Sequence, residues 1–125
     1  MNNLKVEATQ YTPEISLETY GEINIKGKSY PENTFEFYMP ILHWLRTYFT
    51  EPNAPHSLTV NVEITYCNSS SSKLFFDFFD ILDANKENFN ITVNWIFDRE
   101  NDSAKEAGED FIEDFTDLTI HLMAK

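Results

Sequence analysis

Four consecutive serines form the segment of this sequence that is best suited to chemistry. They occupy positions 69–72, between Asn68 and Lys73. Serine hydroxyls accept phosphate, and a helix that begins near Ser71 would place them beside its unpaired backbone N–H groups and the positive end of its dipole. A phosphate there would add about two negative charges to the segment. Serine and asparagine side chains also cap helices, so the spacing leaves both a phosphorylation switch and a plain helix cap open.

An unusually apolar segment follows the serines. Seven of the nine residues in 74–82 are apolar. At 100° per residue they fill a stripe broader than one buried helix face requires, and Phe76 extends it. We therefore expect Phe76, and with it Phe79, to be partly exposed as a docking patch for a protein partner. A helix buried deep in the core would be equally apolar, and this alternative predicts a buried Phe76.

Residues for metal binding are present but follow no ligand motif. Asp77, Asp80 and Asp83 step along one face of the same segment, and such rows are usually solvated. The histidines are His43, His56 and His121, and no two of them have the spacing of a ligand pair. We expect no metal and no cofactor.

The sequence also contains no motif that is typical of an enzyme. The chain has three glycines, with neither a GxGxxG motif nor a P-loop, which argues against nucleotide enzymes. Cys67 is the single cysteine, so neither an internal disulfide nor a CxxC pair is available. An enzyme built on Cys67 and a histidine would need an accessible thiol of depressed pKa. We expect an unreactive thiol and no catalytic residue.

Alternation and helical periodicity predict the elements that position these residues. The expected strands are residues 14–17, 22–25, 58–64, 89–97 and 118–122, and the first two form a hairpin around Tyr20-Gly21. The expected helices are residues 35–49, 71–88 and 103–115, with Pro40 marking either the first turn of the first helix or a kinked start.

The resulting order, β-β-α-β-α-β-α-β, favours one α/β domain over residues 1–125. It should hold a mixed sheet of about five strands, three helices covering one face, and parallel crossovers after the hairpin. Functional loops of such sheets lie at the carboxyl ends of strands, and the serine run occupies such a place.

Composition limits the partners of the protein. The chain has 21 acidic residues against 9 lysines and arginines, a net charge of −12, which repels nucleic-acid phosphates and anionic lipid. No segment approaches the ~18 apolar residues that span a bilayer, and the N-terminal residues do not read as a secretion signal. We expect a cytoplasmic protein with protein partners, no nucleic acid and no membrane insertion.

Five segments follow one another along nearly the whole chain: residues 11–16 (YTPEIS), 27–33 (GKSYPEN), 66–73 (YCNSSSSK), 93–95 (VNW) and 106–111 (EAGEDF). Together they resemble the SiaC family of regulatory phosphoproteins. The resemblance implies a STAS-like (SpoIIAA-like) fold, similar to anti-sigma-factor antagonist domains, and a non-catalytic signalling role. In that family a protein kinase phosphorylates a hydroxyl residue in the loop before the second helix, and a PP2C-type phosphatase removes the phosphate. The unmodified form binds an effector protein, which in the best-known systems is a diguanylate cyclase.

The resemblance also assigns the phosphorylation site. The family has threonine directly after the asparagine of a Tyr-x-Asn motif, and Ser69 stands at that position and keeps the hydroxyl. Ser69 is therefore the expected site, and Ser70 is the second candidate. The partner-binding residues that we expect around it are Asn68, Ser71, Ser72, Lys73, Phe76, Phe79 and Asp80.

A different class of function remains open at the same loop. A small-molecule or ion-binding module would use the cleft near residues 68–73 and the acidic row of the second helix. It would show a ligand-dependent rise in melting temperature without a protein partner.

Overall fold

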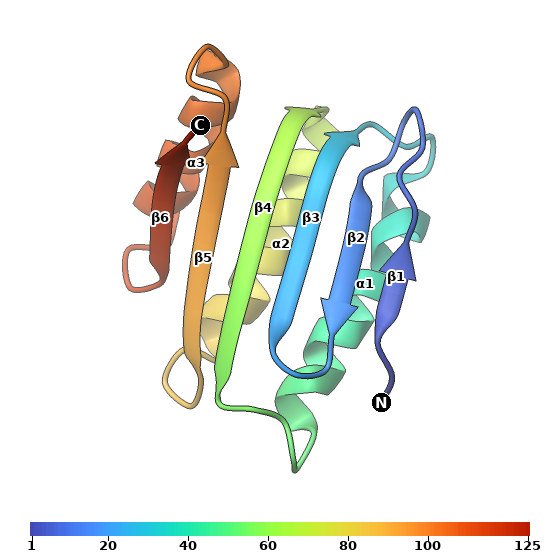
Figure 1. Cartoon of the computed structure of the whole chain (residues 1–125), viewed down its shortest axis with the longest axis vertical. Helices are drawn as coiled ribbons and strands as arrows, with labels where there is room; N and C mark the ends of the chain where they lie inside the picture. The colour runs from blue at the N-terminus through green and yellow to red at the C-terminus, as the bar shows by residue number, and fades with distance from the viewer.

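Alternating apolar side chains build a six-stranded sheet in the computed structural model, which describes residues 1–125. The strands are β1 (Leu4–Val6), β2 (Glu14–Glu18), β3 (Glu22–Ser29), β4 (Ser57–Cys67), β5 (Asn90–Phe97) and β6 (Thr119–Ala124). They lie side by side in chain order (Figure 1). The pairs β1–β2 and β2–β3 are antiparallel, and the remaining pairs are parallel.

The expected α/β class is confirmed, but the expected strand count and the STAS-like label are slightly wrong. The additional strand is β1, which has three residues and pairs along the outer edge of β2. Leu4 and Val6 pack against the core, but three residues are too few for their alternation with Lys5 to indicate a strand from the sequence alone.

Three helices follow the predicted order: α1 (Thr34–Thr50), α2 (Ser69–Ala84) and α3 (Asp102–Asp114). An asparagine side chain caps each N-terminus by accepting a hydrogen bond from the backbone N–H three residues later. The caps are Asn33, Asn68 and Asn101. The helix α1 continues through Pro40 without a break. None of the helices has the length and apolar composition needed to cross a bilayer.

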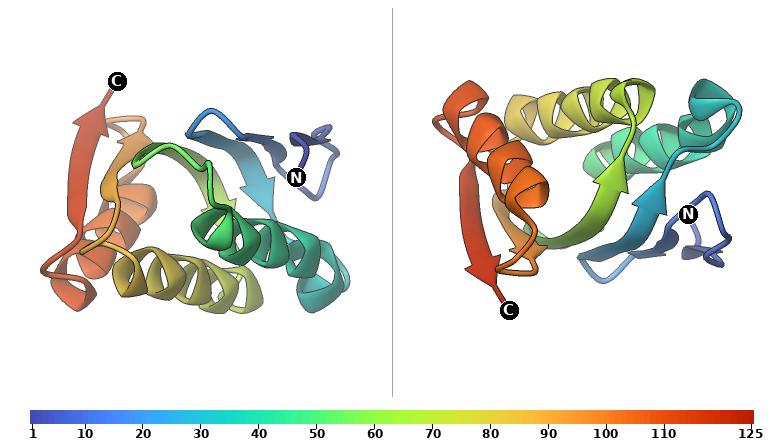
Figure 2. Two further views of the ribbon diagram at one scale, coloured as in Figure 1. Left: turned by 90° about the horizontal axis from the view of Figure 1, so that it is seen from below. Right: turned by 90° about the horizontal axis from the view of Figure 1, so that it is seen from above.

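All three helices cover the same face of the sheet, as expected, and the sheet curves around them (Figure 2). Each parallel crossover moves one strand further in the same direction, and right-handed crossovers then place every helix on one side. The core lies between these layers, and its largest fully buried side chains are Trp95, Tyr48 and Phe79.

The other face of the sheet is polar. Asn61 donates from Nδ2 to Oδ1 of Asn24 over 2.9 Å, and Asn94 donates from Nδ2 to Oδ1 of Asn61 over 2.8 Å. This amide ladder ties β3, β4 and β5 together on the uncovered side.

Gly108 allows α3 to pack closely against the sheet. A Cβ added at Gly108 would lie 2.5 Å from Cδ1 of Trp95 and 2.6 Å from Cδ2 of Leu122, well inside van der Waals contact. Replacing a glycine with alanine inside a helix normally stabilises the helix by about 1 kcal/mol. Because of the overlap, we expect Gly108→Ala instead to lower the free energy of unfolding by about 1–3 kcal/mol in urea denaturation. The exposed neighbour Glu109→Ala serves as control and should stay near wild type; a stabilised Gly108→Ala protein would contradict the close packing.

Candidate functional site

The serine run lies where β4 ends and α2 begins. Asn68 Oδ1 accepts a 2.9 Å hydrogen bond from the backbone N–H of Ser71, so Asn68 caps the helix and no serine does. The helix therefore begins at Ser69, two residues before the expected start, and it ends at Ala84, before the expected Asn88. This position at the carboxyl end of a parallel strand agrees with the expected placement (Figure 1).

The hydroxyls of Ser69 and Ser70 are free. Both residues are exposed in the first turn of α2, and neither hydroxyl makes a hydrogen bond within the chain. Neither is needed to cap the helix, because Asn68 already does so. The plain helix-cap interpretation therefore does not account for these two side chains.

Ser71 has a structural role. Its side chain is 0% exposed, and its hydroxyl oxygen accepts a 2.8 Å hydrogen bond from Ser29 Oγ. The Ser29 hydroxyl is also hydrogen-bonded to Tyr38 at 2.5 Å. Burial raises the pKa of Tyr38 above its ordinary value, which keeps this phenol neutral. The expectation that Ser71 contacts a partner is therefore wrong, because its hydroxyl lies inside the core and joins α2 to β3 and α1.

Removing the Ser71 hydroxyl tests this structural role. We expect Ser71→Ala to lower the free energy of unfolding by about 1–2 kcal/mol, because the buried Ser29 hydroxyl loses its acceptor. Ser70→Ala is the matched control, with an exposed hydroxyl and no expected change. Thermal and urea unfolding of both proteins measure the difference, and equal stabilities would contradict the buried hydrogen bond.

The outer face of α2 presents a mixed docking surface. Ser69, Lys73, Phe76 and Asp80 follow at helical spacing and are all exposed. Phe76 is 44% exposed, and its ring lies 5.0 Å from the ring of Phe115 at one side. The alternative of a helix buried deep in the core, which predicts a buried Phe76, is therefore wrong. The prediction that Phe76 is partly exposed is confirmed.

Phe79 differs from Phe76, and its expected exposure is wrong. Its side chain is 0% exposed. Its ring centroid lies 4.5 Å from that of Phe111 and 6.2 Å from that of Trp95. Phe79 points from α2 into the core, so it packs beneath the exposed face of the helix and cannot contact a partner.

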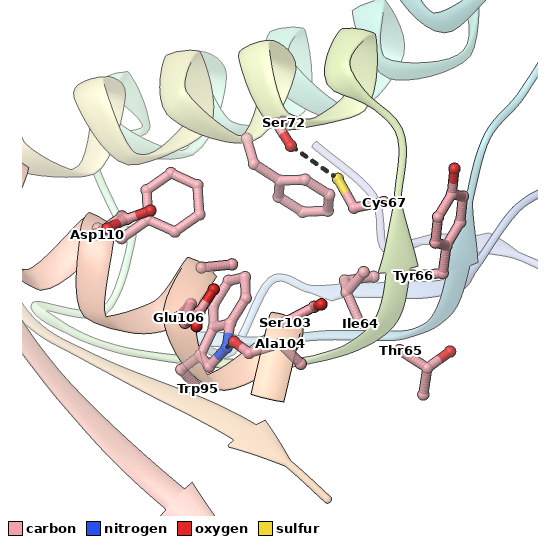
Figure 3. A pocket seen from close by; sticks show the side chains of 13 residues that line it. Ile64, Thr65, Tyr66, Cys67, Ser72, Trp95, Ser103, Ala104, Glu106 and Asp110 are labelled. Carbon is pink, nitrogen blue, oxygen red and sulfur yellow. Dashed lines mark hydrogen bonds between the residues drawn. The ribbon is translucent and has the colours of Figure 1, made fainter. Parts of the chain in front are cut away.

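A cavity of about 360 Å³ opens beside the serine run, between the end of β4 and the helices α2 and α3. Cys67 and Ser72 line one side of it, with Ser72 Oγ 3.3 Å from the Cys67 sulfur, and Glu106 and Asp110 of α3 lie opposite (Figure 3). Trp95 forms part of its wall, but the indole N–H already donates to the carbonyl of Ala104 at 2.8 Å.

The thiol of Cys67 is poorly placed for nucleophilic chemistry. Burial raises the pKa of the Cys67 thiol above its ordinary value, the reverse of what a nucleophilic cysteine needs. No histidine lines the cavity, and no three His, Cys, Asp or Glu side chains come together as a metal site anywhere in the chain. The thiol is therefore a poor nucleophile at neutral pH.

The contribution of α3 to this site was not among the sequence-based expectations. Acidic residues such as Glu106 and Asp110 are typical of a solvated helix face, yet these two border the cavity. Their i, i+4 spacing, with Ala107 and Phe111 one residue further on, was the available signal that one edge of the acidic face adjoins an apolar wall.

The chain is similar to a known protein family over most of its length. The sequence model described as "SiaC family regulatory phosphoprotein" matches residues 6–125. An uncharacterized protein of Pseudomonas aeruginosa strain UCBPP-PA14 is 31% identical over 116 residues, which cover 91% of this chain and 90% of the relative.

Solved structures of similar fold come from the same organism. The crystal structure of apo-SiaC from Pseudomonas aeruginosa superposes with a TM-score of 0.90 at 28% identity, covering 99% of this chain and 100% of that one. A chain in the crystal structure of diguanylate cyclase SiaD in complex with its activator SiaC superposes with a TM-score of 0.89 at 27% identity. The match covers 98% of this chain and 99% of that one.

Proposed function

Because the chain belongs to the SiaC family of regulatory phosphoproteins, we propose that it is a non-catalytic, partner-switching regulator controlled by phosphorylation at the start of α2. Residues 1–125 act as one domain, in the cytoplasm. A protein kinase adds phosphate to Ser69, with Ser70 as the second candidate, and a PP2C-type phosphatase removes it. The unmodified protein binds an effector.

The observation that carries the proposal is the difference among the four serines. The Ser71 hydroxyl is buried and the Ser72 hydroxyl lies against Cys67, whereas Ser69 and Ser70 are exposed and without hydrogen bonds. Ser69 also shares one helix face with Phe76. A modification at Ser69 therefore changes the surface on which a partner would dock.

Local charge supports an effect of phosphate on docking. Lys73 lies one turn after Ser69, and its ammonium group makes no ion pair in the chain. A phosphate on Ser69 would pair with Lys73 and with the free N–H groups of the first turn of α2. The bulky dianion would then stand on the docking face, and Lys73 would no longer be available to a partner.

The proposed effector is a diguanylate cyclase. The similar SiaC protein of Pseudomonas aeruginosa is described as the activator of the diguanylate cyclase SiaD. The test mixes the purified, unphosphorylated protein with diguanylate cyclases of its own host, and measures binding by calorimetry and the rate of cyclic di-GMP formation. We expect one cyclase to bind and to gain activity. If no host cyclase binds, this effector assignment fails.

Phe76 should contribute directly to that binding. We expect Phe76→Ala to weaken cyclase binding at least about tenfold, as truncation of an aromatic anchor does at many interfaces. Phe35→Ala is the matched control, because Phe35 is 61% exposed but lies on α1. The affinity of this variant for the cyclase should stay within about twofold of wild type. Equal losses in the two variants would contradict docking on α2.

One observation favours a second candidate function. The cavity of about 360 Å³ at Cys67 and Ser72 falls within the size range of small-ligand sites. A small-molecule module at the same loop would show a higher melting temperature with a metabolite and without any protein. Screening host metabolites by thermal shift distinguishes it from the partner switch.

A further inference from the structure

The sheet has two free edges, at β1 and at β6, and only the edge at β1 is protected against pairing with another chain. The strand β1 is three residues long, and the exposed Lys5 stands in its middle. Short length and a lysine are common means by which proteins keep a sheet edge from pairing with another chain. The strand β6 is six residues long and contains no lysine, no proline and no bulge. Its outer side is therefore open to pairing (Figure 1).

The hydrogen bonds of Lys125 show which backbone groups of β6 are free. Its N–H donates to the carbonyl of Phe97 at 2.9 Å, and its carbonyl accepts from the N–H of Arg99 at 3.3 Å. Backbone groups of successive strand residues point to opposite sides, so residues 119, 121 and 123 pair with β5 in the same way. The N–H and C=O groups of residues 120, 122 and 124 then point outward, where no further strand lies.

The side chains of β6 hold these free backbone groups in place. Ile120 and Leu122 pack against the core, and α3 covers this part of the sheet (Figure 2). A row of donors and acceptors that is already rigid loses little conformational entropy when a partner pairs with it. An extended segment of another protein can therefore add to β6 as a further strand.

The uncovered face of the sheet changes character at this edge. Met123 is 46% exposed and pairs with Ile96 of β5, so the two side chains form an apolar step on a face that is otherwise polar. Alternate side chains of an added strand would lie on this face. Apolar residues at those positions would cover Met123.

The helix side of the edge is acidic. The cavity side of α3 faces α2, so the helical turn places Lys105, Glu109 and Glu113 on the side away from α2, toward the free edge of β6. Asp117 lies in the turn before β6, and none of these three carboxylates makes an ion pair. With a net charge of −12 for the chain, this surface favours a basic segment and disfavours a second copy of the same protein.

We propose that the outer edge of β6 binds an extended segment of a partner protein, with alternating apolar and basic residues, by strand addition. The apolar side chains lie beside Met123, and the lysines or arginines lie near Glu109 and cover the half-buried Ile112 with their stems. This inference goes beyond the proposed function. The start of α2 follows β4, two strands away from this edge, so one chain can bind two partners at the same time.

The test uses the full-length protein and a synthetic peptide of alternating valine and lysine, about eight residues long. Hydrogen–deuterium exchange of the backbone amides is followed by NMR. The amides of Ile120, Leu122 and Ala124 should exchange rapidly in the free protein and at least about tenfold more slowly with the peptide. Those of His121 and Met123, which bond to β5, should be slow in both states.

Two matched controls separate backbone pairing from charge attraction. The same peptide with every backbone nitrogen methylated keeps its lysines but has no N–H donor, and it should not bind. Ala124→Pro removes one outward N–H at an exposed position and should weaken peptide binding about tenfold, whereas Ala124→Val keeps the N–H and should stay within about twofold of wild type.

Several results would overturn the β6 edge as a binding site for such a partner. They are no binding, binding of the methylated peptide, equal losses in the two Ala124 variants, and protection confined to β1 or α2. A dimer of the protein that Ala124→Pro dissociates would assign the edge to a second copy and overturn the proposed partner. Ser69→Asp should bind the peptide as wild type does, so these outcomes are independent of the test of the proposed function.

Discussion

Replacing Phe79 with alanine is expected to lower the free energy of unfolding by about 3–5 kcal/mol, the usual loss for a buried phenylalanine. The ring is 0% exposed and lies within 6.2 Å, centroid to centroid, of Trp95, Phe111 and Phe115. Domains of this size have about 5–15 kcal/mol of stability in total. Phe79→Ala should therefore remove a large part of it.

Urea denaturation measures this loss, and Phe76→Ala is the matched control. Phe76 lies three residues earlier on the same helix but on its outer face, so its truncation should cost less than about 1 kcal/mol. The two variants should thus separate stability from docking. A loss at Phe79 as small as that at Phe76 would contradict its placement in the core.

Ser69→Asp is expected to weaken cyclase binding at least about tenfold. A carboxylate at the first position of α2 is held by the helix dipole and by Lys73 one turn away, so it imitates part of the effect of phosphate. The fully phosphorylated protein, which carries a larger group and about two charges, should bind more weakly still.

The controls for this prediction separate charge from the loss of the hydroxyl. Ser69→Ala should keep the affinity of the unmodified protein, since the hydroxyl has no partner in the chain. Asn88→Asp adds the same single negative charge at an exposed site away from the start of α2 and should behave as wild type. An unchanged affinity for Ser69→Asp would overturn the proposed polarity of the switch.

Local patterns were sufficient to predict most of the fold. Alternating residues in β2 to β5 and helical spacing in α1, α2 and α3 predicted the element order and the helices on a single face. The three-residue β1 was missed because a single apolar-polar-apolar triplet is too short to indicate a strand. The start of α2 was placed too late because Asn68 and the serines are all good caps, and only the structure shows which one accepts the Ser71 N–H.

The site could be predicted only in part, because burial depends on tertiary neighbours. Phe76 and Phe79 have the same side chain three residues apart, and the packing of α2 against the sheet and α3 encloses Phe79 and leaves Phe76 partly open. The Ser29–Ser71 hydrogen bond joins residues 42 positions apart and has no local signal. The cavity of about 360 Å³ likewise depends on the crossover that brings α3 beside α2.

Mass spectrometry of the protein purified from its own host tests the central claim most directly. Intact-mass and fragment spectra, recorded with and without phosphatase treatment, show whether the chain carries phosphate and on which residue. We predict one phosphate on Ser69, with Ser70 as the second candidate, that phosphatase removes. A chain that stays unmodified under several growth conditions, or that carries its phosphate on Ser72, would contradict the switch at the start of α2.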